Sequence, residues 1–285
     1  MPELPEVETI VRGLRAAVSK RKIMSVRLGK TDFIVEPAAL AERLPGSRIA
    51  AVERYGKFIS LTLEPAGGTP RFYFMIHLGM TGQIIPRASS APIVPHTHVF
   101  LELDDGRELR YTDIRRFGQM FLLPESGIAQ FRTKLGTDPL DITSREFVKR
   151  FRSRRARIKA LLVDQRVLRG MGNIYADESL WRARIHPEKI AATLKPAQLI
   201  ALHRAVRRVL EDAIRLKGSS ISDFLDAEGR RGEYQLHHRV YGRAGKSCSR
   251  CKTTIRRIVV AGRGSYFCPR CQASPRPASR RQPKR

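Results

Sequence analysis

Four cysteines near the carboxyl end constrain this chain more than any other feature of its sequence. Cys248, Cys251, Cys268 and Cys271 follow the spacing C-x2-C-x16-C-x2-C. Two C-x-x-C corners supply four soft ligands in pairs, as a tetrahedral Zn²⁺ ion requires. Two disulfides are the alternative, but nothing in the chain indicates the secreted context in which disulfides persist. Because four thiolates fill the coordination sphere, the spacing predicts one structural zinc ion in a module at about 238–272.

The segment between the second and third cysteines predicts a β-hairpin. Residues 255–267 read as a strand, a glycine turn and a strand, with Arg263 at the tip between Gly262 and Gly264. A zinc-held hairpin that presents one arginine suits phosphate binding or insertion into a groove. A solvated arginine in a turn is the alternative.

The charge of the chain indicates the class of its partner. Lysine and arginine number 54 against 27 acidic residues, which gives a net charge of +27. Such a chain should bind a polyanion, and nucleic acid is the first candidate. Ribosomal, nucleoid and membrane-surface proteins share this signal, so charge alone names no chemistry. No stretch approaches the roughly 18 apolar residues of a membrane span, and we expect no membrane partner.

The first part of the chain predicts a helix followed by an antiparallel sandwich or barrel. From Pro5, apolar residues recur at helical spacing as far as Val18, over about four turns. Short β-branched or alternating runs separated by turn residues follow. These predicted strands cover 23–28, 48–53, 57–63, 72–78, 97–103, 108–112 and 119–123. We place this first domain at 2–124.

After Pro124 the pattern becomes helical, so the fold class is α+β. We expect helices over 144–164 and 173–183, and a third from Pro196 that Gly218 ends. The polar, glycine-bearing segment 218–236 predicts a mobile loop. The second domain therefore covers 125–237 and the zinc module 238–272. Residues 273–285 are rich in proline, serine and arginine and predict a basic, disordered tail.

The first six residues suggest covalent chemistry. If Met1 is removed, Pro2 becomes a terminal secondary amine with a pKa near about 8. Such an amine can attack an electrophilic carbon and form an iminium (Schiff-base) adduct. Glu3 and Glu6 lie beside it as acid–base candidates. The alternative is a helix start, with Pro5 in the first turn and acidic residues near the positive end of the helix dipole.

Other motifs suggest contacts with nucleic acid. A glycine-rich approach to a helix at 168–175, with Asn173 at its start, would bind a phosphate. The segments 77–82 and 111–118 both leave predicted strands and enter turns, and they contain Met80, Arg115 and Phe117. A long apolar, a planar cationic and an aromatic side chain can wedge between bases and fill the space left by an extruded nucleotide. Taken singly, the methionine and the phenylalanine would more often be core residues. Lys57 is a possible second amine or a phosphate ligand.

Taken together, these motifs resemble the formamidopyrimidine-DNA glycosylase family. The resemblance runs from Pro2 to Cys271 with several motifs in one order. They are P-E-L-P-E at 2–6, H-L-G-M at 77–80, Y-T-D-x-R-R-F-G at 111–118, G-N-I-Y at 172–175, Y-G-R at 241–243 and the four cysteines. Leu4 and the context of Met80 favour this branch over the endonuclease VIII-like branch, which usually begins P-E-G-P-E.

The resemblance implies a helix with a β-sandwich, a helix–two-turn–helix domain and a carboxy-terminal zinc finger. It implies a monomeric base-excision-repair enzyme, a glycosylase and AP lyase, in the cytoplasm at the nucleoid. Its substrates would be 8-oxoguanine opposite cytosine and formamidopyrimidines in double-stranded DNA, and its partners also include DNA with abasic sites. Strand cleavage by β,δ-elimination would follow removal of the base.

The resemblance also implies roles for residues of the predicted active site. Pro2 would attack C1′ of the sugar, and Glu3 would protonate the ring oxygen and then shuttle protons. Glu6 would help to position the lesion or its proton chain. Lys57 and Arg263 are the family's proton donors in β- and δ-elimination, and both also contact phosphate.

Further residues would hold the DNA. Arg115 would face the orphaned cytosine, while Met80 and Phe117 fill the void. The other DNA contacts implied by the resemblance are His77, His96, Arg155, Asn173 and Tyr241. The residues implied near the damaged base are Glu178, Ser219 and Ser220.

Departures from the family pattern fall mainly on one loop. Lys217 precedes Gly218 where the family has a Gly-Gly pair, and Ser222 stands where lysine or arginine is frequent. Ile114 stands where proline is common. Because the family uses the loop at 217–224 to hold the flipped purine, these changes bear on lesion preference.

Three alternatives follow. The enzyme could prefer oxidised pyrimidines, as endonuclease VIII-like relatives do. It could bind damaged DNA without turnover, although Pro2, Glu3, Lys57 and Arg263 argue against a pure binding protein. A charge-driven RNA or ribosome binder would not discriminate damaged from undamaged duplex, and its affinity would fall steeply with salt.

Overall fold

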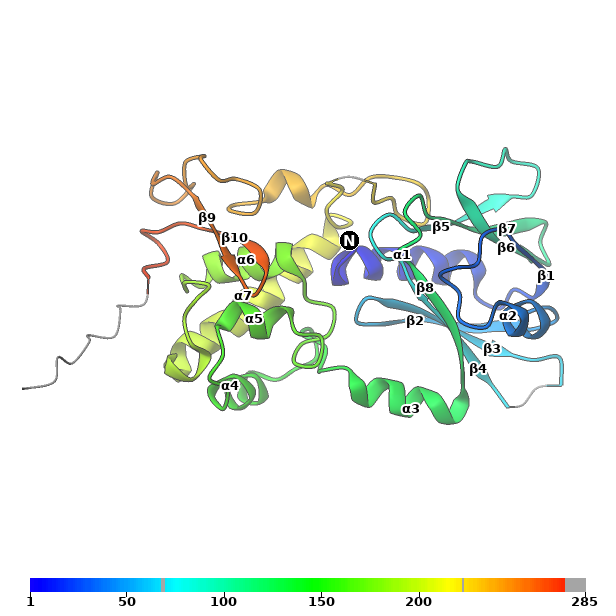
Figure 1. Cartoon of the computed structure of the whole chain (residues 1–285), viewed down its shortest axis with the longest axis horizontal. Helices are drawn as coiled ribbons and strands as arrows, with labels where there is room; N and C mark the ends of the chain where they lie inside the picture. Colours follow the sequence, from blue (N-terminus) through cyan, green and yellow to red (C-terminus); the bar gives the residue numbers. More distant parts are fainter. Residues whose placement is uncertain (68–69, 222, 275–285) are drawn as a thin grey trace, which may run out of the picture.

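The computed structural model describes residues 1–67, 70–221 and 223–274, and these form two halves with the amino terminus between them (Figure 1). The departure at Ser222 and most of the predicted tail, from 275 onward, lie outside the described residues. Within the described part of the chain, no helix is long and apolar enough to cross a membrane.

The first half contains helix α1 (Leu4–Val18) and two four-stranded antiparallel sheets. The first sheet has the strand order β1, β6, β7, β5, which are Ile23–Leu28, Thr97–Leu103, Arg107–Thr112 and Gln83–Ala88. The second has the order β2, β3, β4, β8, which are Arg48–Tyr55, Phe58–Glu64, Phe72–His77 and Gln119–Pro124. One apolar core joins the buried face of α1 to both sheets, which confirms the predicted helix and sandwich.

Two elements of this half were not predicted. Helix α2 (Pro37–Arg43) is short and buries only Leu40. Strand β5 contains Pro86, which interrupts the usual strand pattern. Because β5 is at the edge of its sheet, the missing N–H of proline removes no necessary ladder bond.

The second half is helical. Its helices are α3 (Glu125–Lys134), α4 (Ser144–Arg152), α5 (Ile158–Val163), α6 (Asn173–Arg182) and α7 (Pro196–Arg215), with the 3₁₀ turns η1 (Ala191–Thr193) and η2 (Tyr234–His237). The prediction of one helix over 144–164 is wrong, because the helix is interrupted between the end of α4 at Arg152 and the start of α5 at Ile158. There Arg157 pairs with Ile190 and the Ile158 N–H donates to the Lys189 carbonyl at 2.8 Å, so tertiary pairing replaces helical bonds.

The two halves are joined close to the amino terminus. The Leu4 N–H donates to the Gly170 carbonyl at 3.0 Å, and the Leu4 side chain belongs to the core of the helical half. Arg54 of β2 binds Glu8 of α1 at 2.8 Å and Asp138 of the helical half at 2.9 Å. These contacts hold the first residues of the chain between the halves.

The carboxy-terminal module packs on α6. Strands β9 (Arg256–Val260) and β10 (Arg263–Phe267) form the predicted antiparallel hairpin, and Arg263 pairs with Val260 next to the turn. Cys248 and Cys268 are buried in one apolar cluster with Trp181 of α6. The hairpin is therefore fixed to the helical half on the side where the halves meet.

Candidate active site

A small cavity lies beside Pro2. Its volume is about 40 Å³, and it is open to solvent on one side. Four parts of the chain that are distant in sequence contribute to it. The lining residues are Met1, Pro2, Glu6, Met80, Ile174, Ser219, Ile221 and Phe224.

Glu3 connects the amino terminus to the start of α6. Its carboxylate is 4% exposed and accepts the backbone N–H groups of Ile174 at 3.1 Å and Tyr175 at 3.4 Å. Unpaired N–H groups at a helix start stabilise negative charge. Glu3 therefore occupies two of the N–H groups at this glycine-rich helix start, and a phosphate contact by Asn173 stays a prediction.

Gly172 leaves room for the Glu3 carboxylate. A Cβ added at Gly172 would fall 2.1 Å from Cδ of Glu3, although the extended backbone there (φ −138°) suits any residue. We expect Gly172→Ala to displace Glu3 and to lower the rate of base excision by about 10²-fold, the scale of a misplaced catalytic group. Single-turnover kinetics would measure this. Gly67→Ala, where an added Cβ meets nothing within 4 Å, is the matched control; an unchanged rate in Gly172→Ala would contradict the assignment.

Glu6 begins a buried chain of hydrogen bonds. One carboxylate oxygen accepts the Glu3 N–H at 2.8 Å, and the other accepts the Ser219 N–H at 2.7 Å and the Tyr175 hydroxyl. The Ser219 hydroxyl lies 3.3 Å from the Tyr175 hydroxyl and 3.1 Å from Nε2 of His238. Burial, reinforced by nearby Glu3, raises the pKa of Glu6 to about 7. Glu6 can therefore hold or release a proton near neutral pH.

The raised pKa makes stability depend on pH. The pKa of Glu6 is 4.5 in the unfolded chain and about 7 in the folded protein, so the folded state binds more protons between these pH values. We expect the free energy of unfolding to fall as pH rises through this window, on the order of 3 kcal/mol from this group. Urea unfolding of Glu6→Gln should lack this part of the fall, while Glu8→Gln on the same helix should retain it. Equal pH slopes in wild type and Glu6→Gln would contradict the prediction.

Lys57 of the first half and Arg263 of the zinc hairpin approach each other beside Glu3 at the candidate site. Lys57 lies in the two-residue turn between β2 and β3 and is 7% exposed. Burial lowers the pKa of its ammonium group; the charge of Glu3 opposes this shift and the charge of Arg263 adds to it. A buried lysine between a carboxylate and a guanidinium can lose its proton more readily than a solvated one.

A network of polar contacts holds the Arg263 hairpin on the helical half. The Gly264 carbonyl accepts Nζ of Lys159 at 3.0 Å and Nδ2 of Asn173 at 2.9 Å. Asp177 accepts the Tyr266 N–H at 2.9 Å and forms a 2.7 Å ion pair with Lys159. Lys159 and Asp177 were not predicted, because nothing local in the sequence pairs residues of two different helices.

The four cysteines converge as the spacing predicts. Their sulfur atoms all lie within 4.8 Å of one another, and the nearest pairs are 3.4 Å apart. Zn–S bonds of about 2.3 Å at tetrahedral angles place sulfur atoms about 3.8 Å apart. The arrangement therefore fits one structural zinc ion, with no position left for a substrate.

Met80, Arg115 and Phe117 form one exposed cluster. Met80 is 43% exposed and Phe117 is 56% exposed, so neither residue belongs to the core, which was the alternative for both. An Arg115 amino group lies 3.4 Å from the Met80 sulfur, and its guanidinium carbon lies 4.5 Å from the centre of the Phe117 ring. The structure thus brings together the three side chains predicted to act as a wedge.

Asp113 organises the loop that carries this cluster. The side chain is fully buried, and one oxygen accepts the Thr81 hydroxyl and the Arg115 N–H. The other accepts the Tyr111 hydroxyl at 3.0 Å and the Gly118 N–H at 2.9 Å. The motif at 111–118 contains Asp113, but its sequence does not show that this carboxylate joins two loops.

The remaining predicted DNA contacts occupy different surroundings. Nδ1 of His77 accepts the Gly79 N–H at 3.2 Å, and burial lowers the pKa of His77 to about 4, so a phosphate contact would come from a neutral ring. His96 is exposed in a left-handed conformation (φ 64°), and Arg155 is exposed between α4 and α5. Tyr241 is half-buried against Tyr266.

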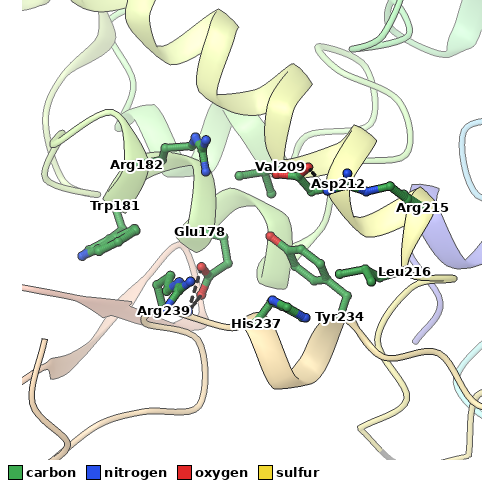
Figure 2. Close-up of a pocket in the computed structure, with 10 residues that line it drawn as sticks. All are labelled: Glu178, Trp181, Arg182, Val209, Asp212, Arg215, Leu216, Tyr234, His237 and Arg239. Carbon is green, nitrogen blue, oxygen red and sulfur yellow. Dashed lines mark hydrogen bonds and ion pairs between the residues drawn. The ribbon is translucent and has the colours of Figure 1, made fainter. Parts of the chain in front are cut away.

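Glu178 lies in a different pocket from Pro2 (Figure 2). Its carboxylate accepts the backbone N–H groups of Arg239, Val240 and Tyr241 at 2.9–3.0 Å, which anchors the chain that enters the zinc module. Tyr234 and His237 line the same pocket. A lesion contact by Glu178 stays a prediction, and these bonds favour an anchoring role.

Ser219 and Ser220, by contrast, are buried close to the amino terminus. Ser219 lines the Pro2 cavity and donates its N–H to Glu6. The Ser220 hydroxyl donates to the Phe224 carbonyl at 2.8 Å and accepts the Gly232 N–H at 2.9 Å. The segment after α7 therefore contributes directly to the cavity.

Comparisons with known proteins match the whole architecture. Residues 1–120 match the formamidopyrimidine-DNA glycosylase N-terminal domain, 135–225 the H2TH domain of the same enzyme, and 245–273 the zinc finger found in FPG and IleRS. The chain is 47% identical to the formamidopyrimidine-DNA glycosylase of Chloroflexus aggregans over 95% of this chain and 98% of that protein. The corresponding enzyme of Solibacter usitatus is 42% identical over 95% and 99%.

Solved structures show the same fold on DNA. Lactococcus lactis Fpg in complex with abasic-site DNA matches with a TM-score of 0.87 and 34% identity, over 95% of this chain and 100% of that one. MutM in complex with DNA that contains carbocyclic 8-oxo-G matches with a TM-score of 0.87 and 34% identity, over 96% and 100%. The predicted fold and the zinc module are thereby confirmed.

Proposed function

Because this chain belongs to the formamidopyrimidine-DNA glycosylase family, we propose that it flips oxidised purines out of duplex DNA, excises them and cleaves the strand. As a glycosylase of this family it acts on damaged bases in DNA. The observation that supports the finer assignment is the position of Pro2. Pro2 lies on a cavity between the two halves, with the Glu3 carboxylate held at a helix start beside it.

Removal of Met1 would expose the nitrogen of Pro2 as a secondary amine. This nitrogen forms a bond to C1′ of the flipped nucleotide, and the bond from C1′ to the base breaks. Glu3, after taking up a proton, gives it to the ring oxygen as the sugar opens, which leaves an iminium ion between Pro2 and C1′. Glu6 and its hydrogen-bonded chain would accept the proton that the attacking amine releases and pass it to the departing base.

Strand cleavage then proceeds from the iminium ion. Loss of a C2′ proton expels the 3′-phosphate, and a second elimination expels the 5′-phosphate. Lys57, whose pKa is lowered by burial, is suited to proton transfer in the first step. The guanidinium group of Arg263 can neutralise the leaving phosphate in the second step. Water finally releases the sugar fragment from Pro2.

The exposed cluster of Met80, Arg115 and Phe117 would occupy the space of the flipped nucleotide, with Arg115 toward the orphaned cytosine. The zinc hairpin would hold Arg263 at the lesion phosphate. A protein that works on chromosomal DNA in this way belongs in the bacterial cytoplasm, and we propose that location.

Borohydride trapping tests this function. The protein is mixed with duplex oligonucleotides that contain 8-oxoguanine opposite cytosine, reduced, digested and analysed by mass spectrometry. We expect a covalent adduct on Pro2. An adduct only with abasic sites or oxidised pyrimidines would keep the chemistry and move the specificity to pyrimidines. Tight binding without an adduct on any of these duplexes would favour a non-catalytic binding protein.

A further inference from the structure

The departure at Lys217 has a structural counterpart. Lys217 follows α7 in a left-handed conformation (φ 58°), where the family pattern has a glycine. A side chain is disfavoured in that conformation, and a contact made by the lysine can offset this cost. Nζ of Lys217 lies 3.3 Å from an Asp226 carboxylate oxygen, and the Asp226 side chain is 5% exposed.

Asp226 is the centre of a compact turn. One carboxylate oxygen accepts the N–H groups of Glu228 at 2.9 Å and Arg230 at 2.8 Å, while the Asp226 N–H donates to the Arg230 carbonyl at 2.8 Å. The other oxygen faces Lys217 and, at 3.6 Å, Nε of Arg230. Lys217 therefore ties this turn to the end of α7.

The same turn is docked on α1. Ala227 is buried in the core of the first half, and a Cβ added at Gly13 of α1 would fall 2.6 Å from the Cβ of Ala227. On the first sheet, the Gln83 side chain donates to the Asp223 carbonyl at 2.7 Å. The turn thus connects the helical half to the sandwich.

Lys217 and Asp226 lie on either side of the residues that line the Pro2 cavity. Ser219, Ile221 and Phe224 are the lining residues in this part of the chain. Those residues approach the place of the base, whereas Lys57 and Arg263, proposed to act on the phosphates, come from other elements.

We propose that the Lys217–Asp226 ion pair is a positioning device that holds the base-facing residues 219–221 and 223–224 in place and so controls base excision without controlling strand cleavage. It deepens the proposed function, on which it rests, by separating the residues that read the base from those that process the abasic sugar. Neither Lys217 nor Asp226 contacts the reacting atoms; both act through the residues between them.

Two substitutions remove the ion pair with little other change. Lys217→Gly restores the residue that the backbone conformation favours. Asp226→Asn removes the charge but keeps an oxygen for the Glu228 and Arg230 N–H groups. Lys20→Gly is the matched control, because Lys20 is an exposed lysine with a left-handed φ of 68° at the far end of α1.

Single-turnover excision of 8-oxoguanine and cleavage of preformed abasic-site duplex are measured for each variant. Since the pair is partly exposed, we expect excision to fall about 3- to 10-fold in each single variant, with abasic-site cleavage unchanged. The double variant should lose no more than either single variant. An equal fall in both reactions, or wild-type excision in both variants, would overturn the proposal.

Trypsin cleavage after Arg230 and Arg231 provides a readout that needs no activity. We expect cleavage there to be several-fold faster in Lys217→Gly and Asp226→Asn than in wild type and Lys20→Gly. Unchanged cleavage would overturn the proposal even for an active enzyme. If wild type excised no 8-oxoguanine, the proposed function would fail, while the proteolysis result would still decide whether the pair holds the segment.

Discussion

Replacement of Pro2 by glycine is expected to lower base excision by on the order of 10³-fold or more and to abolish the trapped adduct at wild-type enzyme concentrations. Loss of a nucleophile has effects of this size in enzymes with covalent intermediates. A terminal glycine leaves a primary amine, but it lacks the ring that restricts the approach of the nitrogen beside Glu3. Borohydride trapping and single-turnover excision measure the two effects.

The control for this prediction is the other proline of the same motif. Pro5 lies in the first turn of α1, so Pro5→Ala should change helix stability slightly and leave the adduct on Pro2. Binding of undamaged duplex should be unchanged in both variants. Wild-type trapping by Pro2→Gly, or active wild-type protein that retains Met1 by intact mass, would show that another amine is the nucleophile.

Lys159→Met is expected to destabilise the protein by about 3–5 kcal/mol. The side chains of Lys159 and Asp177 are 1% and 0% exposed and form a 2.7 Å ion pair. Removal of one partner leaves an uncompensated buried charge, which is the reason for the large effect. The change also removes a donor to the Gly264 carbonyl, next to Arg263. Urea unfolding measures the loss, and strand cleavage should fall more than binding does.

A second substitution separates charge from packing. Lys159→Met combined with Asp177→Asn should recover more than half of the lost stability, because no buried charge remains and an acceptor for the Tyr266 N–H is kept. Arg208→Met, which breaks the exposed pair with Asp212 on α7, should cost at most about 1 kcal/mol. Similar losses for Arg208→Met and Lys159→Met would contradict the role given to burial.

Local patterns in the sequence predicted most of the elements. The apolar spacing of α1, the alternating runs of the sandwich and the cysteine spacing all depend on residues a few positions apart, and the structure contains each of them. The two errors have different causes, one local and one tertiary. Pro86 concealed an edge strand, and the pairing of Ile158 with Lys189 divided a predicted helix.

The sequence predicted individual residues of the candidate site, but it did not predict the residues that hold them. The motifs predicted Pro2, Glu3, Lys57 and Arg263 as site residues. In the structure these residues lie near the place where the two halves meet. The supporting residues Tyr175, Asp113 and His238 were not identified as site residues. Their side chains would suit many positions in a fold, and only their partners make them part of the site.

The sequence by itself determined which chemical groups the chain carries: a proline behind the initiating methionine, nearby carboxylates, four thiols at zinc-binding spacing and an excess of basic residues. Only the tertiary structure decided how these groups are held. Glu3 meets an amide 171 positions away, Lys159 meets the carbonyl of a residue 105 positions away, and Lys217 reaches Asp226 across a turn. Periodicity and turn chemistry act over one or two turns of chain. The burial that shifts the pKa of Glu6 arises only when the two halves pack together. The burial of the Lys159–Asp177 pair arises only when α5, α6 and the zinc hairpin pack together.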